Sequence, residues 1–141
     1  MSFFHASEYP HACGTELVPM PGYDLRWGRC GFYRVLEALR PAGKLGHKEA
    51  VFLCDSLDAL NYAGGFTDYL FEVKPEQAPV RHDMHWSTQI TCLIDEFGLT
   101  LEKALAHPEI IACAHRYWQG EESSRPLWEY LTTSAVVIAE H

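Results

Sequence analysis

Short apolar runs of strand length stand near both ends of the chain, and helical periodicity fills the middle. The runs SFFHAS (2–7), AVFLC (50–54) and DYLFEVK (68–74) have lengths and compositions typical of strands. LWEYLT and AVVIAE, close to the C-terminus, predict two more. Strands at both ends with helices between them predict an α+β domain built on a small mixed or antiparallel sheet.

Apolar spacing predicts the helices in between. Residues 29–40 carry four apolar side chains on one stripe, and Pro41 ends the pattern. After the strand 50–54, either Asp55 or Ser56 caps a helix that Gly64-Gly65 would end. Three more helices are predicted over 87–97, 99–107 and 107–118, with Pro108 in the first turn of the last. Residues 8–27 are predicted as loop and 80–86 as extended chain.

Length and cysteine usage limit the class of protein. The 141 residues show no repeat, linker or low-complexity tract, so one domain over 1–141 is predicted. Five widely spaced cysteines without a CxxC pair argue against a disulfide framework or a zinc ribbon, and reduced thiols indicate a cytoplasmic protein. The N-terminus lacks the features of a secretion signal, and the longest purely apolar run, 135–139, is far too short to span a membrane.

The charge is unevenly distributed along the sequence. The net charge is −8, from 11 basic and 19 acidic residues, yet six of the basic residues lie between Arg26 and Lys48. A globally acidic protein is a poor non-specific binder of nucleic acid. The local basic segment suits one anionic ligand such as a pyrophosphate, or else it is a helix face solvated at the surface.

Glu129 is a carboxylate inside the apolar run PLWEYLTTSAVVI. On a strand it shares one face with Leu127 and Leu131, while Trp128 and Tyr130 share the other. Burying an unpaired carboxylate costs several kcal/mol, roughly, so such a group needs a partner or a function. An arginine of the basic segment is a possible structural partner.

Other candidate groups are less specific. His5 lies between apolar residues in the first predicted strand, where a histidine is more often part of the core than a ligand. The strand-to-helix junction after AVFLC can present backbone N–H groups to an anion. Cys54 near His47 is a conceivable thiol nucleophile, although cysteines on apolar strands are usually inert. His82 with His85, or His11 with Cys13, lacks a second pair at zinc spacing, so no metal is expected.

Three fragments, taken in order, resemble the ADP-ribosyltransferase superfamily of the His-Tyr-Glu type. His5-Ala6-Ser7, at the end of the first strand, resembles its His-Gly-Ser or His-Gly-Thr motif. The run VFLCDSLDALNYA resembles the strand–helix segment of poly-ADP-ribose polymerases, which has Asn-Tyr on the helix. Glu129-Tyr130-Leu131 resembles the glutamate on the closing strand of that family.

A second likeness is to the rifamycin ADP-ribosyltransferases. The shared features are a first-strand histidine, a loop with Pro-Gly (Pro21-Gly22), a strand–helix segment (51–60) and a strand ending as YLFEVKP. Together the likenesses cover roughly residues 3–75 and 126–138. Helical insertions before the closing strand, like 87–119 here, resemble DNA-targeting toxins of the superfamily.

The resemblance implies an α+β core of ADP-ribosyltransferase type that binds NAD+ and cleaves its nicotinamide–ribose bond. Glu129 would be the catalytic carboxylate. His5 would contact the adenosine-side ribose, and Ser7 would lie near the nicotinamide amide. Phe52 stands where the family usually has a stacking tyrosine, and Tyr62 would form the second aromatic wall. For the pyrophosphate, the basic segment offers Arg26, Arg29 and Lys44.

Two departures from the family pattern restrict this reading. Arginine-modifying members carry a glutamate or glutamine two residues before the catalytic glutamate, and here that residue is Leu127. An arginine acceptor is therefore disfavoured, and the acceptor is otherwise open: nucleic acid, protein or small molecule. Phe52 keeps an aromatic face but loses the tyrosine hydroxyl, which leaves a non-catalytic NAD-binding module possible.

Two alternative functions remain open from the sequence. One is a binding protein, such as a phage-encoded inhibitor, favoured by small size, acidic charge and 13% aromatic residues. The other is an RNA 2′-phosphotransferase-like enzyme on the same fold, for which Arg40 and His47 are candidate residues. The first alternative predicts that His5, Phe52, Tyr62 and Glu129 are scattered, whereas the transferase requires them to meet.

Overall fold

The computed structural model describes residues 1–63 and 66–141, so the helix end predicted at Gly64-Gly65 lies outside the described residues. The chain divides into two compact units, each assembled from separate stretches of sequence. We call the first the sheet unit; it comprises Met1–Met20, Glu49–Arg81 and Trp128–His141. We call the second the helical unit; it comprises Pro21–Lys48 and His82–Leu127.

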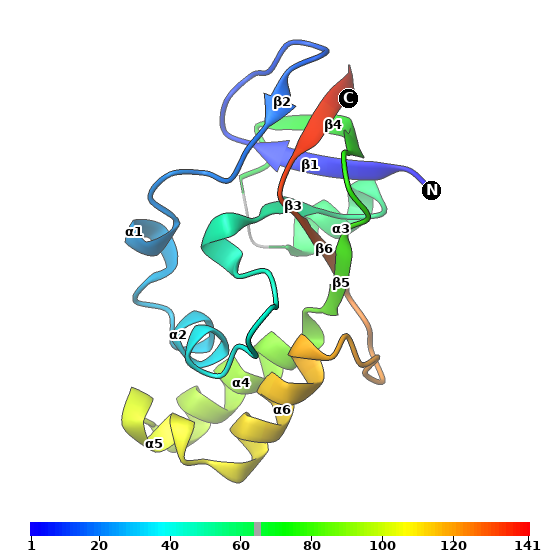
Figure 1. The fold of residues 1–141 in the computed structure, drawn as a ribbon. Helices are drawn as coiled ribbons and strands as arrows, with labels where there is room; N and C mark the ends of the chain where they lie inside the picture. The colour runs from blue at the N-terminus through cyan, green and yellow to red at the C-terminus, as the bar shows by residue number, and fades with distance from the viewer. Residues whose placement is uncertain (64–65) are drawn as a thin grey trace. The chain divides into compact units, whose positions relative to one another are not determined.

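The larger sheet of the sheet unit has the strand order β1-β4-β7-β2 (Figure 1). Its strands are β1 (Phe3–Ser7), β4 (Tyr69–Pro75), β7 (Ala135–Glu140) and β2 (Glu16–Leu17). All three pairings are antiparallel, and His5 pairs with Phe71 in the register of β1 and β4. Apolar and polar residues alternate in DYLFEVK because this strand buries only one face, on which Phe71 and Val73 lie.

A smaller sheet has the order β3-β6-β5. Its strands are β3 (Val51–Leu53), β6 (Trp128–Thr132) and β5 (Val80–Asp83), of which β5 spans the boundary between the two units. β3 and β6 pair antiparallel, with Phe52 opposite Leu131. An isolated bridge between Phe4 and Cys54 connects the two sheets.

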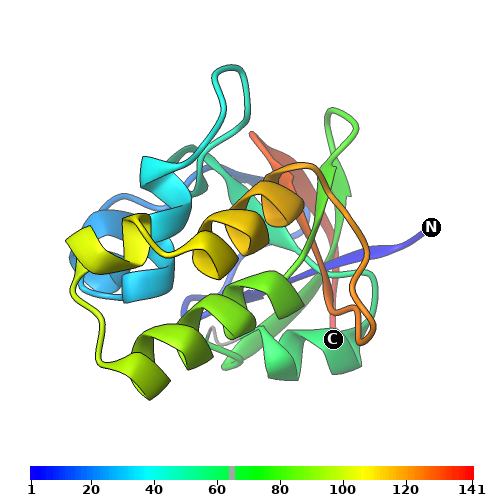
Figure 2. The same ribbon diagram turned by 90° about the horizontal axis from the view of Figure 1, so that it is seen from below.

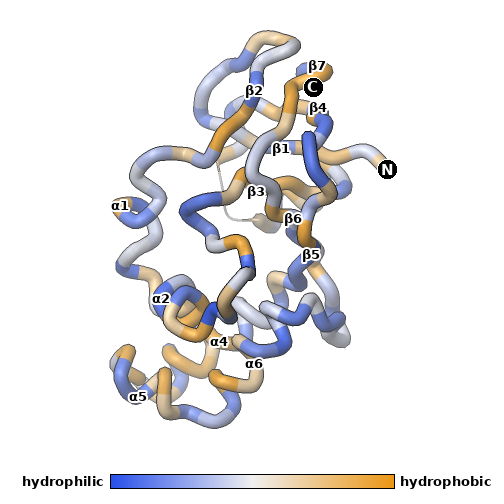
Figure 3. The backbone as a smooth tube through the Cα atoms, in the orientation of Figure 1, coloured by the Kyte–Doolittle hydropathy of each residue, from blue (hydrophilic) through white to orange (hydrophobic). Residues whose placement is uncertain are grey.

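One core serves both sheets of the sheet unit. It is formed by side chains from five strands and their neighbours: Leu17, Val51, Leu53, Phe71, Val73, Tyr130, Ala135 and Val137. Figure 3 shows the hydrophobic stretch of β7 that contributes to it. Helix α3 (Leu57–Tyr62) contacts β1. The Oγ of Ser56 accepts the N–H of Ala59 at 3.1 Å, so Ser56, and not Asp55, is the N-cap.

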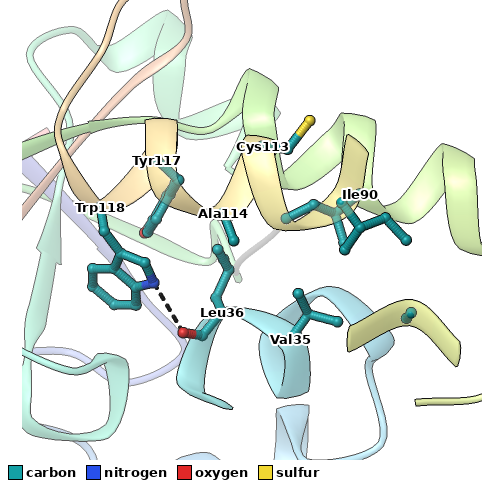
Figure 4. Close-up of a cluster of buried hydrophobic side chains, with 9 residues drawn as sticks. Val35, Leu36, Ile90, Cys113, Ala114, Tyr117 and Trp118 are labelled. Carbon is teal, nitrogen blue, oxygen red and sulfur yellow. Dashed lines mark hydrogen bonds between the residues drawn. The ribbon is translucent and has the colours of Figure 1, made fainter. Parts of the chain in front are cut away.

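The helical unit contains five α-helices, and its core lies among α2, α4, α5 and α6. Their bounds are α1 Tyr23–Trp27, α2 Gly31–Ala38, α4 His85–Phe97, α5 Leu101–Leu105 and α6 Pro108–Trp118. A short 3₁₀ turn, η1 (His47–Glu49), includes the last two residues of one helical-unit stretch and the first residue of the sheet-unit stretch that follows. In Figure 2, α4 and α6 run side by side. Figure 4 shows the fully buried Trp118, whose Nε1–H donates to the carbonyl oxygen of Leu36 at 2.9 Å.

The predicted α+β class is confirmed, and most predicted elements are present within a few residues of their expected bounds. Residues 8–27 are not all loop, because they include β2 and α1. Residues 80–86 are not all extended, because α4 begins at His85. The Oδ1 of Asp83 accepts the N–H of His85 at 2.9 Å and thereby satisfies a free donor of the first helical turn. Within the described residues, no helix has the length and apolar character needed to cross a membrane.

Candidate functional site

Glu129 is the second residue of β6 and lies on the face of this strand opposite the core. Its neighbours Trp128 and Tyr130 both pack on the core of the sheet unit, so Glu129 points to the other side. The side chain is half-buried. Surrounding atoms exclude enough water that burial raises the pKa of the Glu129 carboxyl to about 7.

No other described side chain is hydrogen-bonded or ion-paired to the Glu129 carboxylate. Burial alone accounts for the raised pKa, which a nearby arginine would have lowered. The predicted ion pair between Glu129 and an arginine of the basic segment is therefore absent from the described residues. An isolated carboxylate of this kind is costly to keep, which is typical of a functional group.

Cys54 lies next to Glu129 but is not suited to be a nucleophile. Burial, together with the charges of Glu129 and Asp55, raises the pKa of the Cys54 thiol to about 12. The imidazole suggested for it, His47, belongs to the helical unit and is buried there. His47 Nε2 is 2.6 Å from the hydroxyl of Tyr117, and burial lowers the pKa of His47 to about 3.

His5 and Phe52 are joined directly. His5 Nδ1 lies 2.8 Å from the carbonyl oxygen of Phe52. Because a carbonyl only accepts, Nδ1 carries the proton and Nε2 is an acceptor. Burial lowers the pKa of His5, outweighing the Phe52 carbonyl that raises it, so His5 is neutral at pH 7. Phe52 pairs with Leu131, and Leu131 follows Glu129 by two residues on β6. His5, Phe52 and Glu129 are therefore close to one another within the sheet unit.

Ser7 and Tyr62 are placed differently. Ser7 Oγ lies 3.2 Å from His11 Nε2 and accepts the N–H of Tyr9 at 3.1 Å, so local contacts already engage it. Tyr62 is the last residue of α3 and is 73% exposed. As an aromatic wall it would therefore have to be covered by a ligand, since the protein leaves most of its surface open.

The basic residues are concentrated in the helical unit. Arg26, Arg29 and Lys44 all belong to it. The sheet unit has only Lys74 and Arg81 against ten acidic residues, a net charge of −8, whereas the helical unit has nine of each sign. Lys44 is a source of positive potential at His82, whose pKa is lowered first by burial and also by this charge. Arg40 donates to the carbonyl of Lys44 at 2.8 Å and is paired with Glu37, so structural contacts engage this candidate for RNA 2′-phosphotransfer.

A cluster that the sequence patterns did not reveal lies on the opposite face of β6. The Arg81 guanidinium lies 3.7 Å above the centroid of the Trp128 ring. The Tyr130 hydroxyl donates to Asp55 Oδ2 at 3.3 Å. Alternation along β5 and β6 could have placed Arg81 and Trp128 on one face, but the pairing of these two strands cannot be read from the sequence.

The helical unit has an open groove of about 550 Å³ between α4 and α6. Its lining includes the polar side chains of His85, Gln89 and Arg116. His85 Nε2 and Gln89 Nε2 lie 3.1 Å apart, one helical turn from each other. Among residues 1–63 and 66–141, no three His, Cys, Asp or Glu side chains are grouped as a metal site would require.

Comparisons with known proteins leave the relationship open. The sequence matches no family model, and neither a characterised protein nor a solved structure is significantly similar to it.

Proposed function

We propose that the protein is an NAD+-dependent ADP-ribosyltransferase that cleaves the nicotinamide–ribose bond and transfers ADP-ribose to an acceptor. The observation that carries this proposal is the half-buried Glu129 carboxylate, which lacks an ion-pair partner among the described residues. The His5–Phe52 pair lies in the same unit, close to it in the strand register.

The chemistry requires a fixed negative charge beside the sugar. Loss of nicotinamide leaves an oxocarbenium-like ribosyl cation, and a preorganised carboxylate lowers this barrier. Glu129 accepts a hydrogen bond from the ribose 2′-hydroxyl and stabilises the developing cation. A nucleophile of the acceptor, or water, then bonds to the anomeric carbon and releases its proton to solvent. Because nicotinamide takes the electrons of the broken bond and leaves as a neutral molecule, no acid is needed to protonate it, and one carboxylate suffices where retaining glycosidases use two.

The remaining residues bind the cofactor in this proposal. His5 offers Nε2 as an acceptor to a ribose hydroxyl, because its Nδ1 is already bonded to Phe52. The ring of Phe52 stacks on nicotinamide, with Tyr62 on the other side and Ser7 at the amide. For the pyrophosphate, the sequence offers Arg26, Arg29 and Lys44, which belong to the helical unit, while Lys74 and Arg81 are the basic residues of the sheet unit.

The decisive variant is Glu129→Gln. We expect it to fold and to release nicotinamide from NAD+ about 10²–10³ times more slowly, which is the usual effect of removing one such electrostatic group. Glu140→Gln removes the same charge from an exposed position of β7 and is the matched control. Nicotinamide is quantified by chromatography. Release by Glu129→Gln at the parental rate would rule out the assigned role.

The acceptor remains to be identified by experiment. Leu127 disfavours arginine, and nothing else in the sequence selects among nucleic acid, protein and small molecule. Mass spectrometry of pools of each class, incubated with protein and NAD+, would identify the species that gains ADP-ribose. A cytoplasmic location is proposed from the reduced cysteines expected of this sequence.

A non-enzymatic interaction protein is the second candidate. It is favoured by exposed apolar side chains in the sheet unit, where Tyr9 is 64%, Val18 62% and Tyr62 73% exposed. This alternative predicts no response to NAD+. Millimolar NAD+ should raise the melting temperature if the transferase proposal is right, because a ligand that binds only the folded state stabilises it.

A further inference from the structure

Asp83, the last residue of β5, is a fully buried carboxylate that organises three separate points of the chain. Its Oδ1 accepts the N–H of His85 at 2.9 Å and the N–H of Leu127 at 3.0 Å. Its Oδ2 accepts the N–H of Ser123 at 2.7 Å. The end of β5, the start of α4 and the segment before β6 therefore share one anchor.

These hydrogen bonds keep Asp83 ionised although it is buried. Burial raises the pKa of the carboxyl, but the hydrogen bonds from Ser123, Leu127 and His85 outweigh it and hold the pKa below its ordinary value. Charge-assisted hydrogen bonds of this kind are about twice as strong as neutral ones. A buried carboxylate with three backbone donors fixes the positions of those donors.

Leu127 is held by both of its backbone groups. Its N–H donates to Asp83, and its carbonyl accepts the N–H of Met84 at 2.8 Å. Strand β6 begins at the next residue, and Glu129 follows one residue later. Side chains alternate along a strand, so a shift of one residue at its start would turn Glu129 into the core and Tyr130 out of it.

We propose that Asp83 is a positioning residue for Glu129: by fixing Leu127 it sets the frame of β6 and keeps the Glu129 carboxylate on the side opposite the core. Its importance for catalysis rests on the proposed function, whereas its effect on Glu129 does not. Asp83 itself touches no reacting atom in this proposal.

The test is Asp83→Asn. An amide keeps one acceptor oxygen and places an NH₂ group where the other oxygen accepted, so at least one backbone N–H loses its partner. We expect the pKa of Glu129, measured by carboxyl carbon NMR in the intact protein, to rise above about 7, because a shift of the strand would turn the carboxyl into the apolar core. Nicotinamide release per folded molecule should fall about 10²-fold, as small misplacements of a catalytic group can cause.

The control is Thr100→Ala, which removes a different stabilising contact from the same unit. Thr100 Oγ1 accepts the N–H of Lys103 at 3.3 Å and caps α5. This variant should lose stability without moving the pKa of Glu129. If Asp83→Asn likewise leaves the Glu129 pKa unchanged, Asp83 is only structural and the inference is overturned.

Hydrogen exchange of the unmodified protein supplies a second measurement should Asp83→Asn not fold. The amides of Ser123 and Leu127 should exchange as slowly as those of paired strand residues. Exchange as fast as in an open loop would refute the anchor. If the parent protein releases no nicotinamide, the proposed function fails, and the Glu129 titration still decides the role of Asp83.

Discussion

At the residue scale, Glu129 combines a half-buried side chain with a carboxylate that has no ion-pair partner among the described residues. The alternation of LWEYLT placed Trp128 and Tyr130 on one face and Glu129 on the other, and both of those aromatic residues do pack on the core. Whether an arginine paired with Glu129 depended on contacts between segments far apart in the chain, which periodicity does not encode. In the structure, the Glu129 carboxylate has no ion-pair partner among the described residues.

The raised pKa predicts how Glu129 affects stability. Its folded-state value of about 7 exceeds the ordinary 4.5, so the fold prefers the protonated form. The stabilising contribution is complete below pH 4.5 and is lost as pH rises through 7. Glu129→Gln should therefore be more stable than the parent at pH 8, by roughly 1 to 3 kcal/mol, and about equal at pH 4.

Urea unfolding at the two pH values measures this difference, with Glu140→Gln again as the control for charge. A variant that is destabilised at pH 8 would mean that the ionised carboxylate is well solvated or paired in the folded protein. The same titration predicts that nicotinamide release rises with pH through about 7, because only the carboxylate form is active.

At the scale of elements, apolar periodicity predicted the helices and strands that bury one face. It did not predict an element that forms only because it pairs with a distant strand. Helix α6 was predicted from Pro108 and its apolar stripe, and β7 from AVVIAE. β2 has only two residues and exists because Glu16 and Leu17 pair with β7. The start of α4 was missed because Asp83, two residues upstream, supplies its hydrogen-bond acceptor.

Trp118 links α6 to α2 and gives a prediction for these elements. Trp118→Phe removes the Nε1–H that donates to the carbonyl of Leu36, in a fully buried place. We expect a loss of about 2 to 4 kcal/mol, from the unsatisfied carbonyl and the smaller ring. Trp27→Phe, at a half-buried indole, is the comparison and should cost clearly less in denaturant unfolding. Equal losses would contradict the importance of this hydrogen bond.

At the scale of the whole molecule, the chain alternates between two compact units, each built from separate stretches of sequence. The sequence did not predict this division. No linker or low-complexity tract lies at Met20, Lys48, Arg81 or Leu127, so the sequence indicated no domain boundary there. The sequence showed the basic segment 26–48 directly. Only the structure showed that this segment belongs to the helical unit. A single folding domain over 1–141 and an ADP-ribosyltransferase core both stay predictions.

Two buried histidines predict the response of the helical unit to acid. His47 and His82 are 4% and 1% exposed, and burial lowers the pKa of both, to about 3 for His47. Because the folded-state pKa lies below the ordinary 6.5, the contribution of these histidines to the free energy of unfolding is complete above pH 6.5. It is lost as the pH falls toward 3. We expect the free energy of unfolding to fall by about 1 to 3 kcal/mol between pH 7 and 4.5 on this account.

Replacing His47 with glutamine should reduce this acid sensitivity, since glutamine does not titrate. His115→Gln, at an exposed position of α6, should leave it unchanged. Stability is followed by urea titration at each pH. An acid dependence that is identical in the parent and in His47→Gln would show that other groups cause it.

The interleaved connectivity has a practical consequence for dissecting the protein. No single cut of the polypeptide yields either unit as an unbroken fragment, because each is made of stretches separated by the other. Truncation libraries would therefore return incomplete pieces. Isolating the first unit calls for synthetic bridges that splice Met20 to Glu49 and Arg81 to Trp128, and the strand carrying Glu129 would then lose the anchor that Asp83 gives it.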